Sequence, residues 1–254
     1  TVNPASYLVD SSRQVGKYND NHNHRQGQVF MRYFPINLDI HGKPVVIVGG
    51  GTVAARKCQT LLAAGARVTV IAPTVTAPLR ELAGKGRVCH LARKYTGGDL
   101  AGSFLVFAAT DSHLVNRAVA KEAKNCGILA DVVDAHDQSD FTSPAVVSRG
   151  GLMITVSTEG ESPALARKIR AELEQHYGPE YSELIKIMGR VREKLLTEKR
   201  KSSYNKNILL SLVEQDLPAL LKKRAVAEID NLLRKHCGPG FSLAELGMGE
   251  KDKE

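Results

Sequence analysis

The chain has 254 residues, of which 43% are hydrophobic, which is enough for one large or two small domains with a sizeable core. Only 5% are aromatic and none is tryptophan, which argues against an aromatic platform for sugars or nucleic acids. The net charge of +8 fits a nucleic acid, an anionic membrane surface or a polyanionic small molecule as partner, and equally a basic face turned to solvent.

Two features of the sequence bear on where the protein is found. No apolar run approaches the ~20 residues that cross a bilayer, and no charged-then-apolar leader opens the chain. The four cysteines include no Cys-x-x-Cys pair and lie inside otherwise regular segments. We therefore expect buried, reduced thiols, no membrane partner and a cytoplasmic location.

Residues 1–30 are polar and show no hydrophobic period, so we expect them to be a disordered N-terminal extension. Further on, short apolar runs alternate with helical patterns. This alternation is typical of βαβ units and predicts an α/β fold, with a Rossmann-type parallel sheet over residues 31–142. Its expected strands cover 45–48, 66–72, 88–92, 104–109 and 128–133, and its expected helices cover 53–64, 76–82 and about 111–124.

The pattern changes after the last of these strands. Two further strands, 145–148 and 152–157, are expected to form a hairpin, and Ser162-Pro163 begins a helix that runs to about 177. Residues 143–177 therefore form a small β/α segment.

The C-terminal part is helical by its periodicity. We expect a helical domain over 178–237, with breaks near 201–205 and at Pro218. Residues 238–254 are rich in glycine and then charged, and are expected to be a flexible tail.

A glycine-rich motif follows the first expected strand. Gly49-Gly50-Gly51-Thr52-Val53-Ala54 fits the G-x-G-x-x-A pattern between a strand and a helix, a context in which the pattern indicates dinucleotide binding. Gly49 permits the tight turn, Gly51 lets the backbone approach a pyrophosphate, and Ala54 lets the helix pack on the strand. The free N–H groups at the start of the helix would bind the phosphates.

One part of the dinucleotide pattern is missing. An acidic residue should end the second strand to bind the ribose, but the sequence there is Ile71-Ala72-Pro73-Thr74. This rule therefore leaves open whether the cofactor is NAD or NADP. Thr74 or a backbone group could bind the ribose hydroxyl. Thr110, after the strand 104–109, is expected to contact the cofactor.

Several further motifs occur in a fixed order, and with the glycine loop they resemble the precorrin-2 dehydrogenase/sirohydrochlorin ferrochelatase family of sirohaem synthesis. The match runs from about residue 34 to 170. The motifs are Ala54-Ala55-Arg56-Lys57, Ala108-Ala109-Thr110-Asp111, Val132-Val133-Asp134, Phe141-Thr142-Ser143-Pro144-Ala145 and Ser162-Pro163-Ala164-Leu165-Ala166-Arg167.

The resemblance implies an enzyme that uses NAD to oxidise precorrin-2 to sirohydrochlorin, and in some members also inserts Fe²⁺ to make sirohaem. It implies a homodimer formed through the segment after the Rossmann domain. It places Thr52, Val53, Pro73 and Thr74 at the cofactor, and Asp134 at the position of the catalytic aspartate. Glu159 and Glu161 depart from the small residues common there. In the longer fusion enzymes a methyltransferase domain follows, and this chain is too short to hold one.

The residues themselves support parts of this expectation. Asp134 ends a strand at the carboxyl edge of the sheet, where it could accept a proton or briefly hold Fe²⁺; the alternative is that it only caps a loop. Arg149 and Arg167 could bind the carboxylates of the tetrapyrrole, or could simply face solvent. No set of residues is expected to form a resident metal site.

Three other functions compete with a bifunctional enzyme. One is a dehydrogenase without chelatase activity, and another is a regulatory module that binds NAD without chemistry. A third, a nucleic-acid binder using Lys199-Arg200-Lys201 and Lys222-Lys223-Arg224, has no supporting helix-turn-helix or aromatic platform, so we expect no nucleic-acid partner.

Overall fold

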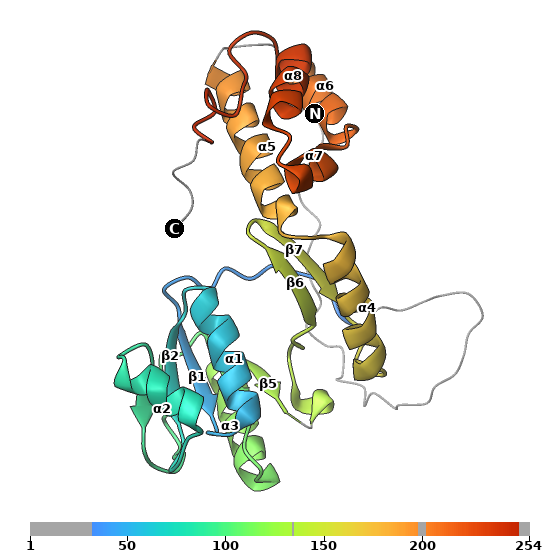
Figure 1. Ribbon diagram of the computed structural model, residues 1–254. Coiled ribbons are helices and arrows are strands. Elements are labelled where there is room, and N and C mark those ends of the chain that lie inside the picture. The colour runs from blue at the N-terminus through green and yellow to red at the C-terminus, as the bar shows by residue number, and fades with distance from the viewer. Residues whose placement is uncertain (1–31, 134, 198–201, 249–254) are drawn as a thin grey trace, which may run out of the picture. The chain divides into compact units, whose positions relative to one another are not determined.

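The computed structural model describes residues 32–133, 135–197 and 202–248, with no side-chain description for His136 and residues 202–204 (Figure 1). The expected disordered extension, residues 1–30, lies outside the described residues, and so does Asp134.

The predicted parallel sheet is confirmed. Its five strands lie in the order β3-β2-β1-β4-β5, and all neighbouring pairs run parallel. The chain therefore crosses over the sheet after β3, and the switch point lies between β1 and β4. The strands are β1 (Pro44–Val48), β2 (Arg67–Ile71), β3 (Cys89–Leu91), β4 (Leu105–Ala108) and β5 (Leu129–Val132).

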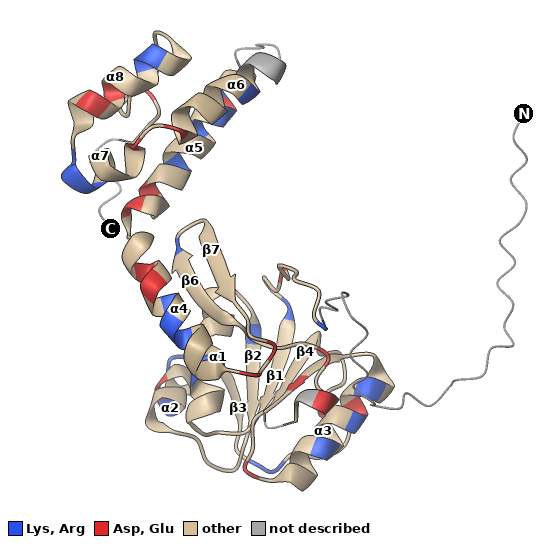
Figure 2. Cartoon of the chain, turned by 90° about the vertical axis from the view of Figure 1, so that its right-hand side faces the viewer, with Lys and Arg blue, Asp and Glu red and all other residues tan. Residues whose placement is uncertain are grey.

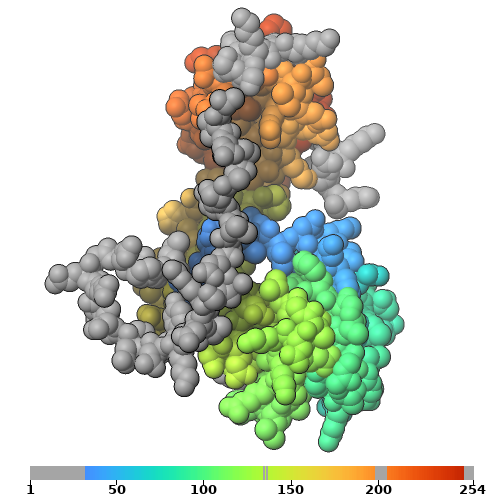
Figure 3. Space-filling view, turned by 180° about the vertical axis from the view of Figure 1, so that it is seen from behind, coloured from blue at the N-terminus to red at the C-terminus, as the bar shows by residue number. Residues whose placement is uncertain are grey.

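Helices cover both faces of this sheet. The helices α1 (Thr52–Ala63) and α2 (Ala77–Gly84) pack on one face, and α3 (His113–Cys126) packs on the other (Figure 1). Seen from behind, the light-green residues of α3 face the viewer (Figure 3). Because both faces are covered, the central strands β1 and β4 are continuous apolar runs, and every residue of β4 is buried.

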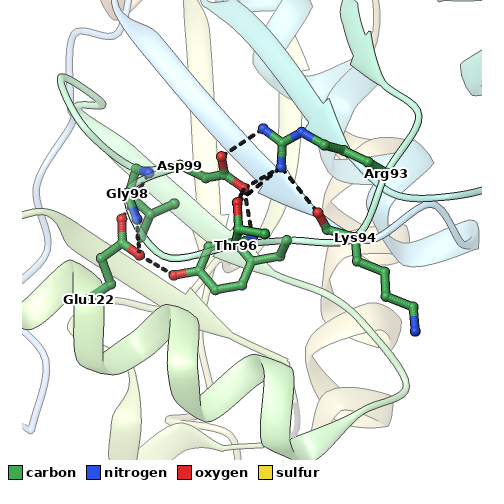
Figure 4. Close-up of polar contacts among 8 residues, drawn as sticks. Arg93, Lys94, Thr96, Gly98, Asp99 and Glu122 are labelled. Carbon is green, nitrogen blue, oxygen red and sulfur yellow. Dashed lines mark hydrogen bonds and ion pairs between the residues drawn. The ribbon is translucent and has the colours of Figure 1, made fainter.

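The crossover between β3 and β4 is held by two carboxylates (Figure 4). Asp99 accepts two hydrogen bonds from the Arg93 guanidinium, each 2.7 Å long, and this contact lowers the pKa of Asp99 to about 2. Glu122 of α3 accepts from the Tyr95 hydroxyl and from the backbone N–H of Gly98 (3.1 Å). Burial and the Glu122 contact raise the pKa of Tyr95. The crossover is thereby fixed against α3.

A hairpin and one helix follow the Rossmann sheet. The strands β6 (Ala145–Arg149) and β7 (Leu152–Val156) pair antiparallel, after a short 3-10 turn over His136–Gln138. The helix α4 (Pro163–His176) packs on one face of the hairpin, where Val147 is fully buried. The Ser162 side chain caps α4 by accepting from Leu165 N–H, as the Ser-Pro motif predicts.

Four helices build the C-terminal part around a core of their own. They are α5 (Glu180–Thr197), α6 (Ser202–Val213), α7 (Leu217–Lys223) and α8 (Val226–Cys237). The break expected at Pro218 is confirmed, because Pro218 lies in the first turn of α7. Of the break expected near 201–205, residues 202–205 belong to α6, and residue 201 lies outside the described residues.

The flexible tail expected over 238–254 is wrong for residues 238–248. Phe241 is fully buried in the helical core, and Leu243 and Leu246 are also buried there. The backbone N–H of Leu243 donates to Asp230 of α8 at 2.7 Å. Glycine richness suggested disorder, but three apolar side chains at short intervals supply enough burial to order this segment. Residues 249–254 lie outside the described residues.

Cysteine burial also differs from expectation. Cys58 and Cys237 are buried, whereas Cys89 and Cys126 are exposed, and none of the four forms a disulfide. Among the described residues, no helix combines the length and apolar character that a membrane span requires.

Candidate functional site

The glycine loop lies at the switch point, where it touches the ends of two neighbouring strands. Gly49 has φ +129°, and a Cβ there would lie 2.1 Å from the Ala109 carbonyl oxygen after β4. A Cβ on Gly50 would lie 2.0 Å from the carbonyl oxygen of Thr74, after β2. Both positions therefore require glycine, because the backbones that follow β1, β2 and β4 meet there.

Gly51 differs from its two neighbours. A Cβ at Gly51 would meet nothing within 4 Å, so this glycine leaves open space at the start of α1. Gly51 is also the N-cap residue, and no side chain caps this helix end. An uncapped helix start beside open space at the carboxyl edge of a parallel sheet fits a dinucleotide pyrophosphate. Ala54 is fully buried against the sheet, as predicted.

The end of β2 forms the neighbouring wall. Pro73 and Thr74 are both exposed at this edge, as a role at the cofactor requires. The backbone N–H of Thr76 donates to the carbonyl of Gly50 at 2.9 Å, whereas the Thr76 hydroxyl is buried without a hydrogen-bond partner. A buried polar atom without a partner beside the glycine loop is consistent with a ligand group that completes its hydrogen bonding. No motif in the sequence marks Thr76 as a candidate site residue.

Thr110 follows β4, but its polar groups face the protein. Its hydroxyl donates to Asn116 Oδ1 at 2.7 Å, and Asn116 Nδ2 donates to the carbonyl of Thr110 at 3.0 Å. Asn116 is buried in the first turns of α3. This pair fixes the loop after β4, and the expected contact of Thr110 with the cofactor stays a prediction.

The loop that contains Asp134 is closed at its base by contacts to β5. The Ser139 hydroxyl accepts from the N–H of Val132 at 2.9 Å, and an Asp140 carboxylate oxygen accepts from the N–H of Ala130 at 2.9 Å. These contacts return the chain along the edge of the sheet. Asp134 itself is outside the described residues, two positions after the end of β5.

A buried ion pair lies close to this return segment. Lys57 Nζ of α1 contacts Asp131 of β5 at 2.6 Å, and their side chains are only 13% and 11% exposed. The Ser143 hydroxyl joins both, at 3.0 Å from Lys57 Nζ and 3.1 Å from Asp131. Lys57 Nζ also lies 4.8 Å from the centroid of the Phe107 ring. In the sequence, Lys57 stands out only as part of a motif. Its partners could not be predicted, because nothing in the local pattern connects positions 74 and 86 residues apart.

The two arginines predicted to bind substrate have different surroundings. Arg149 Nε donates to the carbonyl of Tyr177 at 3.0 Å, and another of its nitrogens donates to the carbonyl of Ser148 at 2.9 Å. These bonds tie the hairpin to the end of α4, so a substrate would have to compete for the same donors. Arg167 is exposed on α4, and within the described residues its side chain donates a hydrogen bond to the carbonyl of Pro163, at 3.3 Å. Both substrate roles stay predictions.

No group of three or more His, Cys, Asp or Glu residues within the described part of the chain could hold a metal ion.

Two protein-family models match parts of this chain. A family model described as putative NAD(P)-binding matches residues 36–145, and one described as the central part of a sirohaem biosynthesis protein matches residues 149–176. The first contains the glycine loop and the end of β2, and the second contains β7 and α4 but only the last residue of β6.

Curated relatives carry the same name repeatedly. Siroheme synthase 2 of Aeromonas salmonicida is 35% identical over 226 residues, which cover 83% of this chain and 47% of the relative. Siroheme synthase of Chromobacterium violaceum is 43% identical over 163 residues, which cover 64% of this chain and 35% of the relative. The chain therefore spans about half the length, or less, of these relatives.

A solved structure extends the match to almost a whole protein. SirC, a precorrin-2 dehydrogenase, superposes with a TM-score of 0.66 at 29% identity, over 77% of this chain and 98% of SirC. Together, the two family models, the curated relatives and this structure show that the chain belongs to the precorrin-2 dehydrogenase/sirohydrochlorin ferrochelatase family of sirohaem synthesis.

Proposed function

We propose that the chain oxidises precorrin-2 to sirohydrochlorin with NAD as cofactor. The observation that carries this proposal is the match to SirC, because it covers 98% of a protein named as a precorrin-2 dehydrogenase. In this reaction the substrate loses two hydrogens, one as a hydride and one as a proton. Bound NAD⁺ supplies the acceptor for the hydride.

The chain's own residues bind the cofactor and take up the proton. Gly49, Gly51, Thr52 and Val53 bind the pyrophosphate at the start of α1, while Pro73 and Thr74 border the adenosine ribose. Asp134 accepts the proton as a general base. Support for this role comes from its position in the sequence after β5, which ends at the same edge of the sheet as the glycine loop.

The substrate is a polycarboxylate, so its binding requires cations. The first turns of α4 carry Arg167 and Lys168, and acidic residues follow further along the helix (Figure 2). We assign Arg167 to the substrate carboxylates, since its guanidinium is exposed and contacts only a single carbonyl within the described residues. Arg149 is the second candidate, and it must exchange its backbone partners to take this role.

We infer a homodimer, formed through the hairpin. One face of the hairpin packs on α4, and its other face carries Val146 and Met153, which are 38% and 55% exposed. Val146 and Met153, which share this face with the exposed Ser148 and Thr155, offer apolar surface that a second copy could cover. The proposed use of NAD also agrees with the cytoplasmic location expected from the sequence.

The decisive experiment is an anaerobic absorbance assay with precorrin-2 and NAD⁺. We expect sirohydrochlorin to form with equimolar NADH. Asp134→Asn should lower kcat by about 100-fold or more, in the range that a general base contributes. Asp137→Asn is the matched control, because Asp137 is an exposed acid in the same loop. Formation of no product by the wild-type chain would favour the regulatory module instead.

Fe²⁺ addition to the same assay separates the two enzymatic alternatives. Sirohaem formed faster than in a protein-free control would identify a ferrochelatase as well as a dehydrogenase. Sirohydrochlorin without sirohaem would identify a dehydrogenase alone. If Asp134→Asn kept full chelatase activity, Asp134 would have no part in metal insertion.

A further inference from the structure

We propose that the adenosine end of the cofactor site accepts a 2′-phosphate, with Arg80 as the residue that binds it. The chain would then bind NADP as well as NAD. This inference rests on the proposed function, since it concerns the same cofactor site. It addresses the choice between the two nucleotides, which the missing acid after β2 leaves open.

The first observation is the absence of a repelling charge. In NAD-specific Rossmann domains, a carboxylate after the second strand accepts hydrogen bonds from the ribose hydroxyls and disfavours a phosphate there. Here β2 ends at Ile71, and no acid occurs from Ala72 through Arg80. The first turn of α2 also contains no acid. A 2′-phosphate at this edge therefore meets no nearby carboxylate from the β2–α2 turn.

The second observation is a cation at the same turn. Arg80 lies in the first turns of α2, and one of its guanidinium nitrogens donates to the carbonyl of Val75 at 3.4 Å. This long contact directs the guanidinium back over the turn between β2 and α2. Because the side chain is exposed and the bond is weak, a phosphate could replace the carbonyl with shorter, charge-assisted hydrogen bonds.

The guanidinium of Arg80 is also held less tightly by the protein than the guanidinium of a nearby arginine. Arg93, after β3, has its guanidinium held by Asp99 through two bonds of 2.7 Å (Figure 4). Within the described residues, the Arg80 guanidinium contacts that single carbonyl. Of these two arginines, Arg80 therefore loses less when it turns to a phosphate.

The third observation concerns the start of α2. The N-cap residue Thr76 makes no side-chain capping bond, and its hydroxyl is buried without a partner beside Gly50. A hydroxyl here can donate to an oxygen of the ribose or its phosphate. The helix start adds a partial positive charge to the same turn. The missing acid after β2, the Arg80 guanidinium and the start of α2 all favour an anion at the 2′ position of the ribose.

Nucleotide binding tests the inference without any turnover. The full chain is titrated with NADH and with NADPH, and the fluorescence of the bound nicotinamide gives each Kd. We expect the two wild-type Kd values to agree within about tenfold. Arg80→Ala should weaken NADPH binding by about tenfold or more and NADH binding by less than about twofold, because one charge-assisted phosphate contact is lost.

Two further variants make the test specific. Arg87→Ala removes the same charge from the residues just before β3, at the amino edge of the sheet, and should change neither Kd. Thr74→Asp restores an acid after β2, and should weaken NADPH binding by about 30-fold or more, far more than it weakens NADH binding.

The outcomes separate this inference from the proposed function. NADH binding with NADPH more than about 100-fold weaker in the wild type would overturn the inference and leave the proposed function standing. Equal losses for both nucleotides in Arg80→Ala would remove Arg80 from the specificity role. Binding of neither nucleotide would overturn the proposed function and the inference together.

Discussion

At the scale of single residues, the three glycines after β1 make different demands on the backbone. A methyl group at Gly50 would collide with the carbonyl of Thr74, whereas a methyl group at Gly51 would enter open space. Gly50→Ala should therefore destabilise the fold by roughly 1–3 kcal/mol, the usual effect of overpacking. Gly51→Ala should change stability by less than ~1 kcal/mol, because its extended backbone conformation also suits alanine. Urea unfolding of the ligand-free chain measures both.

The same two variants locate the cofactor. If the pyrophosphate occupies the open space at Gly51, then Gly51→Ala should weaken NADH binding by about tenfold or more despite normal stability. Unchanged NADH affinity in this variant would place the pyrophosphate elsewhere. A stable, fully binding Gly50→Ala would show that the Thr74 turn yields easily, and would contradict the tight contact described above.

At the scale of elements, the helices and strands could be predicted from the sequence, whereas the contacts between distant side chains could not. The spacing of apolar residues, and the Gly, Pro and Ser residues at the ends of elements, predicted the parallel sheet and the start of α4, because these signals are local in the sequence. Phe241 was missed because its burial depends on helices that precede it by many residues. Asp131 and Thr76 were missed for a similar reason: their contacts join segments that only the folded sheet brings together.

The Lys57–Asp131 pair is the element-scale contact with the clearest energetic consequence. Lys57→Met or Asp131→Asn alone leaves a largely buried charge without its partner, and each should cost about 2–4 kcal/mol of unfolding free energy. The double variant should cost less than the sum of the two, with a coupling of more than about 1 kcal/mol. Ser143→Ala should cost about 1 kcal/mol, since it removes one neutral partner from the pair.

The single and double variants of Lys57 and Asp131 form a double-mutant cycle, and an exposed pair of the same charges is its matched control. Glu81 of α2 and Lys85, the C-cap residue of that helix, contact each other at 2.5 Å with both side chains 65% exposed. Lys85→Met and Glu81→Gln should show no measurable coupling, because solvent screens the pair. Additive losses in the Lys57–Asp131 cycle would mean that the ion pair does not join α1 to β5 energetically.

At the scale of the whole molecule, the chain contains separate apolar cores under α1, under α3 and among the C-terminal helices. The hairpin has far less to bury. Its α4 face encloses Val147, while Val146 and Met153 on its other face remain in solvent. Isolated two-stranded sheets are marginally stable in water, so a second copy on the outer face would stabilise this segment as well as join two chains.

Met153→Glu tests that dimer. The substitution places a charge on the exposed face of the hairpin and leaves the α4 face intact, so it should dissociate the dimer without unfolding either chain. Light scattering after size exclusion should give twice the 27.6 kDa chain mass for the wild type and the single-chain mass for the variant. Leu114→Glu is the control, because Leu114 is 80% exposed on α3, a helix of the Rossmann sheet that is no part of the hairpin, and this variant should stay dimeric. A wild-type chain that is monomeric at micromolar concentrations, or a Met153→Glu variant that keeps the full dimer mass, would exclude this face as the interface.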